Sequence, residues 1–122
     1  MSKKILTIDD QGDIRRLIRM ALEFDGRHQV VEAMDADEGL LVARREKPNL
    51  ILLDLNMPRI NGIEMCQRLS QDPQLSEIPV ILLTGSNDPE LRRQGQAAGA
   101  RVFLTKPFNP MQLLDLIDDH AN

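Results

Sequence analysis

The chain has 122 residues, a formal net charge of -4 and a hydrophobic fraction of 42%. This length is typical of one folded domain, and we expect a single domain over residues 1–122. No apolar stretch approaches the ~20 residues of a membrane span, and the 15 basic residues form no long run, so we predict neither membrane insertion nor direct nucleic-acid binding.

Strand and helix patterns alternate from the start of the chain. Ile5–Ile8 is an apolar run of strand length, and 30–33 is a weaker one. The apolar residues between them repeat at the spacing of one helix face: Ile14, Leu17, Ile18, Ala21 and Leu22. Asp35 followed by Glu38 is an acidic variant of the capping box, which predicts a helix from there to about Lys47.

The alternation continues to the end of the chain. Apolar runs of strand length cover 50–55, 80–83 and 102–104, and the last two lack polar alternation, as is typical of parallel strands covered on both faces. Three further helices are predicted. Asn61-Gly62 breaks the chain before the first of them, and Asp88-Pro89 and Asn109-Pro110 each place a capping side chain before a proline at the first helical position.

The helix predicted from 88 to 98 has few large apolar residues and contains Gly95. An internal glycine costs about 1 kcal/mol relative to alanine. We interpret this segment either as a poorly optimised surface helix or as an element held loosely so that it can shift.

Five repeats of strand and helix predict an α/β fold with a parallel sheet and helices on both faces. Binding sites of such sheets form at the carboxyl ends of the strands. The polar residues expected at that edge are Asp9 and Asp10, Asp54 and Asn56, Thr84, and Lys106.

Three converging carboxylates repel one another, at about 4 kcal/mol for one pair ~4 Å apart at an effective dielectric near 20. The Lys106 amine, or a bound Mg²⁺ or Mn²⁺ ion, would relieve this repulsion. The sequence contains neither a glycine-rich phosphate loop nor a histidine at a strand end. The remaining chemistry is transfer of a phosphoryl group to Asp54, stabilised by the metal, Lys106 and Thr84.

Four strand-end motifs in this order resemble the receiver domain of two-component response regulators, and the resemblance covers essentially the whole chain. The motifs are Asp9-Asp10, Asp54 with Met57-Pro58 and Gly62, Thr84-Gly85, and Lys106-Pro107-Phe108. The resemblance implies a flavodoxin-like (βα)5 doubly wound sheet of strand order 2-1-3-4-5 in three α/β/α layers. That strand order follows from the family and not from the residues.

The resemblance also implies the roles of individual residues. Asp54 would accept a phosphoryl group from a sensor histidine kinase or a histidine phosphotransfer protein. Asp9, Asp10, Asp54 and the backbone carbonyl of Asn56 would hold Mg²⁺. Lys106 would pair with these acids and then with the phosphoryl group. The Lys106–Pro107 bond would be cis, in a tight turn.

The family's switch residues correspond to Thr84, whose hydroxyl would move toward the phosphoryl group, and Phe103, whose ring would turn inward. The output surface would comprise the fourth helix, fifth strand and fifth helix, acting on a downstream protein or a covalently linked output domain. The kinase would dock near the first helix, at Ile14 or Ile18. We expect a monomer or a phosphorylation-dependent dimer.

Two other functions remain open from the residues alone. A phosphate-ester hydrolase with an aspartyl nucleophile typically carries a second acid two residues later, where Asn56 cannot act as one. A receiver-like interaction module that no longer uses phosphate would not need all of its acids. We therefore expect a switch that assists only its own phosphorylation and dephosphorylation, and not an enzyme. The only cysteine, Cys66, excludes an internal disulfide and favours a cytoplasmic location.

Overall fold

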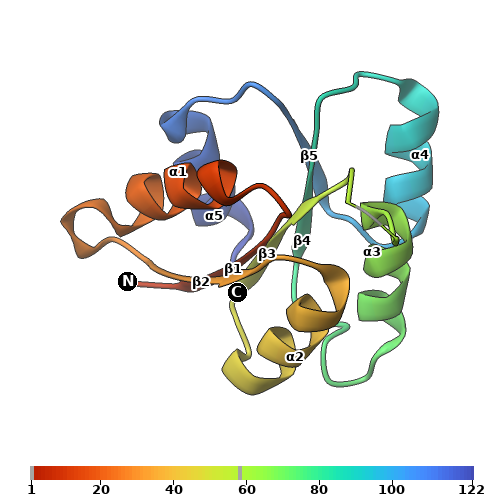
Figure 1. Cartoon of the computed structure of the whole chain (residues 1–122), viewed down its shortest axis with the longest axis horizontal. Helices are drawn as coiled ribbons and strands as arrows, with labels where there is room; N and C mark the ends of the chain where they lie inside the picture. Colours follow the sequence, from red (N-terminus) through yellow and green to blue (C-terminus); the bar gives the residue numbers. More distant parts are fainter. Residues whose placement is uncertain (1, 58) are drawn as a thin grey trace.

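The computed structural model describes residues 2–57 and 59–122, which form one parallel sheet between two layers of helices (Figure 1). The strands are β1 (Lys4–Ile8), β2 (Gln29–Ala33), β3 (Leu50–Asp54), β4 (Val80–Thr84) and β5 (Val102–Thr105). The helices are α1 (Gly12–Glu23), α2 (Ala36–Glu46), α3 (Gly62–Gln71), α4 (Pro89–Ala97) and α5 (Pro110–His120), with a 3-10 helix at Phe24–Gly26. The strand order β2-β1-β3-β4-β5 confirms the predicted flavodoxin-like fold. Pro58, part of the predicted Met57-Pro58 motif, lies outside the described residues.

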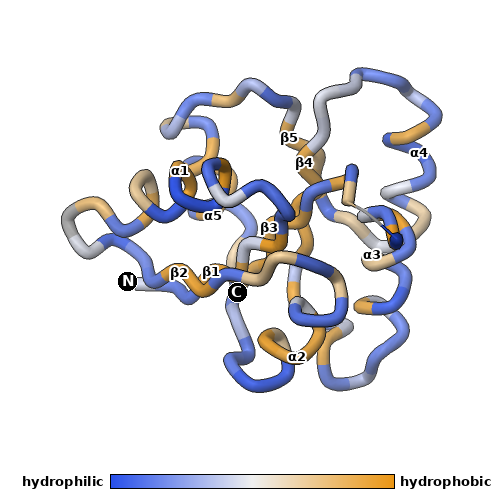
Figure 2. The backbone as a smooth tube through the Cα atoms, in the orientation of Figure 1, coloured by the Kyte–Doolittle hydropathy of each residue, from blue (hydrophilic) through white to orange (hydrophobic). Residues whose placement is uncertain are grey.

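Two apolar cores lie on opposite faces of the sheet. Helices α1 and α5 pack on one face with residues such as Leu52, and α2, α3 and α4 pack on the other with residues such as Leu53. All five residues of β3 are buried. In Figure 2 the tube through the central strands has the colour of hydrophobic residues. Burial on both faces explains why these strands lack polar alternation.

Side-chain caps open the helices where the sequence predicted them. Asp35, Asn61, Asp88 and Asn109 each accept a hydrogen bond from a backbone amide in the first turn of the helix that follows. Asn109 also completes a capping box with Gln112. Asp35 accepts from the Glu38 amide, but the Glu38 carboxylate accepts from the amide of Met34 and not from that of Asp35, as a standard capping box would require. Asp10 does not cap α1, whose N-cap is Gln11.

The exposed face of α1 differs from the prediction. Ile18 is fully buried, so it is not available for docking a kinase, whereas Leu17 and Met20 are 47% and 66% exposed. The predicted apolar stripe is wider than the strip that the sheet and α5 can cover, and periodicity does not show which edge stays outside. With Phe24, these exposed residues line a shallow apolar hollow of about 330 Å³ between α1 and α5.

Helix α4 has few apolar anchors, as predicted, and Gly95 is the residue that it buries. An ideal Cβ on Gly95 would lie 2.2 Å from Cζ of Phe103. The glycine therefore makes room for the Phe103 ring, which is only 9% exposed and has the Arg92 guanidinium 5.4 Å above it. The predicted inward turn of this ring starts from an outward position, but here the ring is already inward. Among the described residues, no helix is long and apolar enough to cross a membrane.

Candidate functional site

The carboxyl ends of β1, β3, β4 and β5 meet at one edge of the sheet. Ile8 pairs with Leu53, so Asp9 and Asp54, which come next in each chain direction, lie side by side at the ends of neighbouring strands. Thr84 pairs with Thr105 farther along the same edge. Asp9, Asp10 and Asp54 each offer a carboxylate oxygen within 4.8 Å of the others. The predicted convergence of the three acids is confirmed.

Asp9 is fully buried, and its two carboxylate oxygens have different surroundings. Oδ1 accepts a hydrogen bond from the Gln11 amide at 2.9 Å, whereas Oδ2 has no hydrogen-bond partner within the described part of the chain. Burial disfavours the charged form and raises the pKa of Asp9; the Gln11 amide opposes this rise, and the Asp54 charge adds to it. A buried oxygen without a donor is energetically unfavourable, so this site is suited to a cation.

Lys106 supplies one positive charge to the acids. Its amine lies 3.2 Å from Oδ1 of Asp54 and 3.6 Å from Oδ2 of Asp9. The Lys106–Pro107 bond is cis, as predicted, and the Lys106 amide donates to the carbonyl of Thr84 at 2.7 Å, which joins the ends of β4 and β5. One ammonium cannot neutralise three carboxylates.

The three carboxylates fit a hard divalent cation, and among the described residues no group donates a hydrogen bond to Oδ2 of Asp9. Mg²⁺ and Mn²⁺ prefer all-oxygen ligands, with one or two carboxylates and the remaining positions filled by water or phosphate oxygens. Asp10 is exposed, so a cation here would keep contact with solvent. The site residues therefore match the predicted metal on chemistry and on spacing.

The remaining predicted residues surround the acids. Thr84 is buried, and its hydroxyl oxygen accepts from the Ser86 amide at 3.1 Å. Asn56 is exposed two residues after Asp54. The structure thus brings Asp9, Asp10, Asp54 and Lys106 into one cluster, while the Thr84 hydroxyl bonds within its own loop.

Gly62 begins α3 directly against the end of β3. Its amide donates to the carbonyl of Leu55 at 2.8 Å. An ideal Cβ would lie 2.7 Å from the carbonyl oxygen of Asp54 and 2.7 Å from Cα of Leu55. Both neighbours are backbone atoms, so only a residue without a Cβ lets the helix start this close to Asp54.

Arg15 is a residue at this site that sequence reasoning missed. Its guanidinium donates to the carbonyl oxygen of Asp9 at 2.7 Å. The spacing between Arg15 and Asp9 carries no motif, and the contact depends on how α1 is turned against β1 and β2. Only the tertiary arrangement reveals it.

Replacing Asp9 is expected to stabilise the metal-free protein. The folded-state pKa of Asp9 lies above its ordinary value of 3.8, so its stabilising contribution is present below that value and is lost as the pH rises through the folded-state pKa. Near pH 7, Asp9→Asn should raise the free energy of unfolding by about 1 kcal/mol, because the amide removes a buried charge and its repulsion from Asp54.

Urea unfolding with and without Mg²⁺ checks this expectation. Mg²⁺ should stabilise the wild-type chain much more than Asp9→Asn, since binding to the folded state alone adds to its stability. The advantage of the variant should shrink as the pH falls through the raised folded-state pKa of Asp9, and it should be absent below about pH 3.8, where the wild-type carboxylate is protonated in both the folded and the unfolded state. A variant less stable than wild type near pH 7 without metal would contradict the electrostatic account.

Comparison with known proteins places this site in a family. The family model for the response regulator receiver domain matches residues 5–118. The probable transcriptional regulator ycf27 of Porphyridium aerugineum is 40% identical over 91% of this chain, which spans 45% of that protein. The phosphate regulon transcriptional regulatory protein PhoB of Pseudomonas aeruginosa is 39% identical over 93% of this chain, which spans 49% of it.

The chain thus spans about half the length of these curated relatives. Their names describe transcriptional regulators, which conflicts with the predicted lack of direct nucleic-acid binding. That prediction concerned residues 1–122 alone and does not extend to a longer protein that contains them.

A solved structure agrees over the whole fold. The chemotaxis protein CheY4 of Vibrio cholerae superposes with a TM-score of 0.92 at 32% identity, covering 99% of this chain and 100% of that one. The sheet order, the acidic cluster and the match over residues 5–118 agree with one another. The chain belongs to the response regulator receiver domain family of two-component systems.

Proposed function

We propose that the chain is a phosphorylation switch in which Asp54 accepts a phosphoryl group from a phosphohistidine on a sensor kinase or a phosphotransfer protein. One observation carries this proposal. Asp54 is 3% exposed and sits at the sheet edge with two further acids within 4.8 Å and the Lys106 amine 3.2 Å away. A buried structural acid would need only the lysine, whereas a phosphoacceptor needs the whole set.

In the proposed step a carboxylate oxygen of Asp54 attacks the phosphorus of the phosphohistidine. A new O–P bond forms, the P–N bond breaks, and the imidazole nitrogen leaves with the bonding electron pair and takes up a proton. Lys106 would stabilise the charge on the transferred oxygens. The Thr84 hydroxyl would give up its hydrogen bond from the Ser86 amide and donate to a phosphoryl oxygen.

The residues proposed to hold the metal are Asp9, Asp10, Asp54 and the backbone carbonyl of Asn56. Mg²⁺, with Mn²⁺ as a substitute, would supply positive charge to the phosphoryl oxygens when bound. Oδ2 of Asp9, which accepts no hydrogen bond from the described residues, supports this assignment. The chain would assist only its own phosphorylation and hydrolysis and would turn over no separate substrate.

The phosphoryl charge would bias the loop after β4, helix α4 and the Phe103 ring. The inward ring is the arrangement that phosphorylation would stabilise, through movement of Thr84. The surface formed by α4, β5 and α5 would then act on a downstream protein or on a covalently linked output domain, as a monomer or a phosphorylation-dependent dimer.

The proposed donor surface is the apolar hollow between α1 and α5, where Leu17, Met20 and Phe24 are exposed. Of the two residues predicted for this surface, Ile18 is buried, whereas Ile14 is half-buried and stays part of the proposed surface. A cytoplasmic location agrees with the free thiol of Cys66, because the cytosol keeps thiols reduced. Burial also raises the pKa of this thiol to about 11.

Intact-mass spectrometry after incubation with a small phosphodonor and Mg²⁺ tests the proposal. We expect a mass gain of one phosphoryl group in the wild-type chain, no gain in Asp54→Asn, and no gain after chelation of the metal. Asp115→Asn is the matched control, because that aspartate is exposed on α5, and it should label like wild type. Undiminished labelling of Asp54→Asn would refute the assignment.

A further inference from the structure

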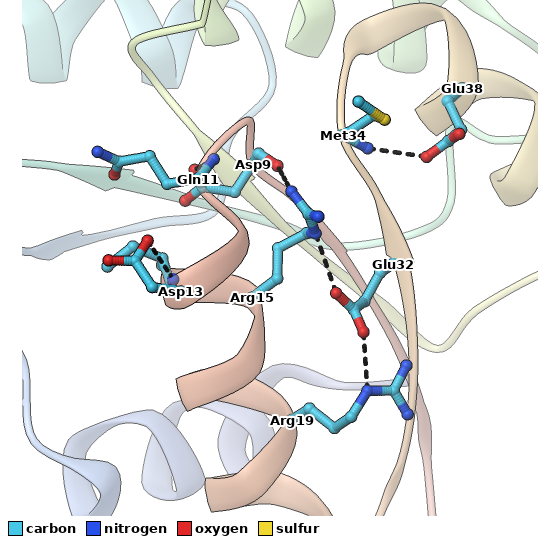
Figure 3. A network of polar contacts seen from close by, with 9 residues as sticks. Asp9, Gln11, Asp13, Arg15, Arg19, Glu32, Met34 and Glu38 are labelled. Carbon is cyan, nitrogen blue, oxygen red and sulfur yellow. Dashed lines mark hydrogen bonds and ion pairs between the residues drawn. The ribbon is translucent and has the colours of Figure 1, made fainter.

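Arg15 joins helix α1 to the main chain of the acidic cluster. Its Nη1 donates to the carbonyl oxygen of Asp9 at 2.7 Å, and its Nε donates to Oε1 of Glu32 in β2 at 2.9 Å. Figure 3 shows the guanidinium between these two acceptors. Because both donors belong to one rigid plane, the two bonds fix the position of the group as well as its charge.

The Asp9 carbonyl lies just beyond the last residue of β1. The Asp9 amide still bonds to β2, donating to the carbonyl of Ala33 at 3.1 Å. The carbonyl of Asp9 belongs to the planar peptide group that links Asp9 to Asp10. Holding this plane fixes the two Cα atoms from which both carboxylates project.

A second arginine braces the same acid without reaching the site. Arg19 donates from Nε to Oε2 of Glu32 at 2.8 Å and from Nη1 to Glu23, whose carboxylate accepts from the Val30 amide. In Figure 3 Arg19 lies on the far side of Glu32 from Asp9. Arg15 and Arg19 therefore share a partner and a helix but differ in their contact with Asp9.

We propose that Arg15 is a positioning residue of the metal site, which holds the Asp9–Asp10 peptide group so that both carboxylates face one cation. This inference rests on the proposed function, since it requires that the acids bind Mg²⁺. Loss of an outer-sphere partner typically weakens metal affinity 10- to 100-fold. Because Arg15 contacts the main chain and no carboxylate of the cluster, we expect the lower end of that range.

Isothermal titration of the full chain with Mg²⁺ tests the inference without any phosphorylation assay. Arg15→Gln should bind Mg²⁺ about 10-fold more weakly than wild type, whereas Arg19→Gln should bind as wild type does. Arg15→Lys keeps the charge but cannot donate from one plane to both acceptors, so it should also bind weakly. The amide NMR signal of Gln11, which donates to Oδ1 of Asp9, should shift in metal-free Arg15→Gln and not in Arg19→Gln.

The outcomes separate this inference from the function on which it rests. Equal Mg²⁺ affinity of wild type and Arg15→Gln would overturn the role of Arg15 and leave the metal site intact. Wild-type affinity in Arg15→Lys would overturn positioning in favour of charge alone. Equal weakening in Arg15→Gln and Arg19→Gln would show a general effect of the Glu32 network. A wild-type chain that binds no Mg²⁺ would overturn the metal site and the inference together.

Discussion

Replacing Gly62 with alanine is expected to lower the free energy of unfolding by about 3 kcal/mol and to impair phosphorylation of Asp54. The added Cβ would meet the carbonyl oxygen of Asp54 and Cα of Leu55, each at 2.7 Å. Overpacking against a flexible side chain can relax by rotation, but these neighbours are backbone. Either α3 or the end of β3 must move, and the second movement displaces Asp54 itself.

Urea unfolding and the rate of labelling by a small phosphodonor together check this expectation. Gly85→Ala is the matched control, because no atom of residues 2–57 or 59–122 lies within 4 Å of an ideal Cβ at that position, and its stability should stay close to that of wild type. If Gly62→Ala were as stable as Gly85→Ala, the close approach of α3 to β3 would not be a real constraint.

Gly95→Ala is expected to expel the Phe103 ring from its inward position. The new Cβ would lie 2.2 Å from Cζ of that ring and 2.9 Å from Cδ1 of Leu82. The ring is the far end of a rotatable side chain, so it can turn outward. Loss of its burial, roughly 1.5–3 kcal/mol, is partly offset by the gain of about 1 kcal/mol from alanine in a helix, so the free energy of unfolding should fall by about 0.5–2 kcal/mol.

The larger effect of Gly95→Ala concerns the switch. If phosphorylation stabilises the inward ring, reciprocity requires that an outward ring disfavour phosphorylation. At limiting phosphodonor, the ratio of phosphorylated to unphosphorylated chain should fall by about 5-fold or more. NMR contacts between the Phe103 ring and the Leu82 methyl groups report the ring position. Phe103→Leu in the Gly95→Ala background shortens the side chain and should restore the tight packing of α4. Unchanged ring contacts in Gly95→Ala would contradict this account.

Much of the fold follows from local patterns. The apolar runs located all five strands to within a residue or two. The signal is clearest in β3 and β4, because a strand buried on both faces contains little but Val, Ile and Leu. Asp35, Asn61, Asp88 and Asn109 located the helix starts because each cap depends only on the next few residues. The acidic cluster followed from the general rule that parallel strands end at one edge.

Other features depended on contacts between distant segments. Gly95 was interpreted as a weakness of α4, although it accommodates a ring from β5. Ile18 was placed outside because an apolar stripe does not reveal which edge is covered. The contact from Arg15 to the Asp9 carbonyl requires the rotation of α1 against the sheet, and the strand order came from the family. Packing decides such features, and short-range spacing does not encode packing.

Reductive trapping of the phosphorylated chain tests the central claim most directly. Borohydride reduces an acyl phosphate to an alcohol, which converts the modified aspartate to homoserine, and phosphate esters of serine or threonine are left unchanged. The tryptic peptide 46–59 contains Asp54 as its only aspartate. After treatment with a small phosphodonor and Mg²⁺, fragmentation of this peptide is predicted to show homoserine at position 54 and nowhere else in the chain. A chain that gains a phosphoryl group yet shows homoserine at another aspartate, or none at all, would contradict the assignment of Asp54 as the phosphoacceptor.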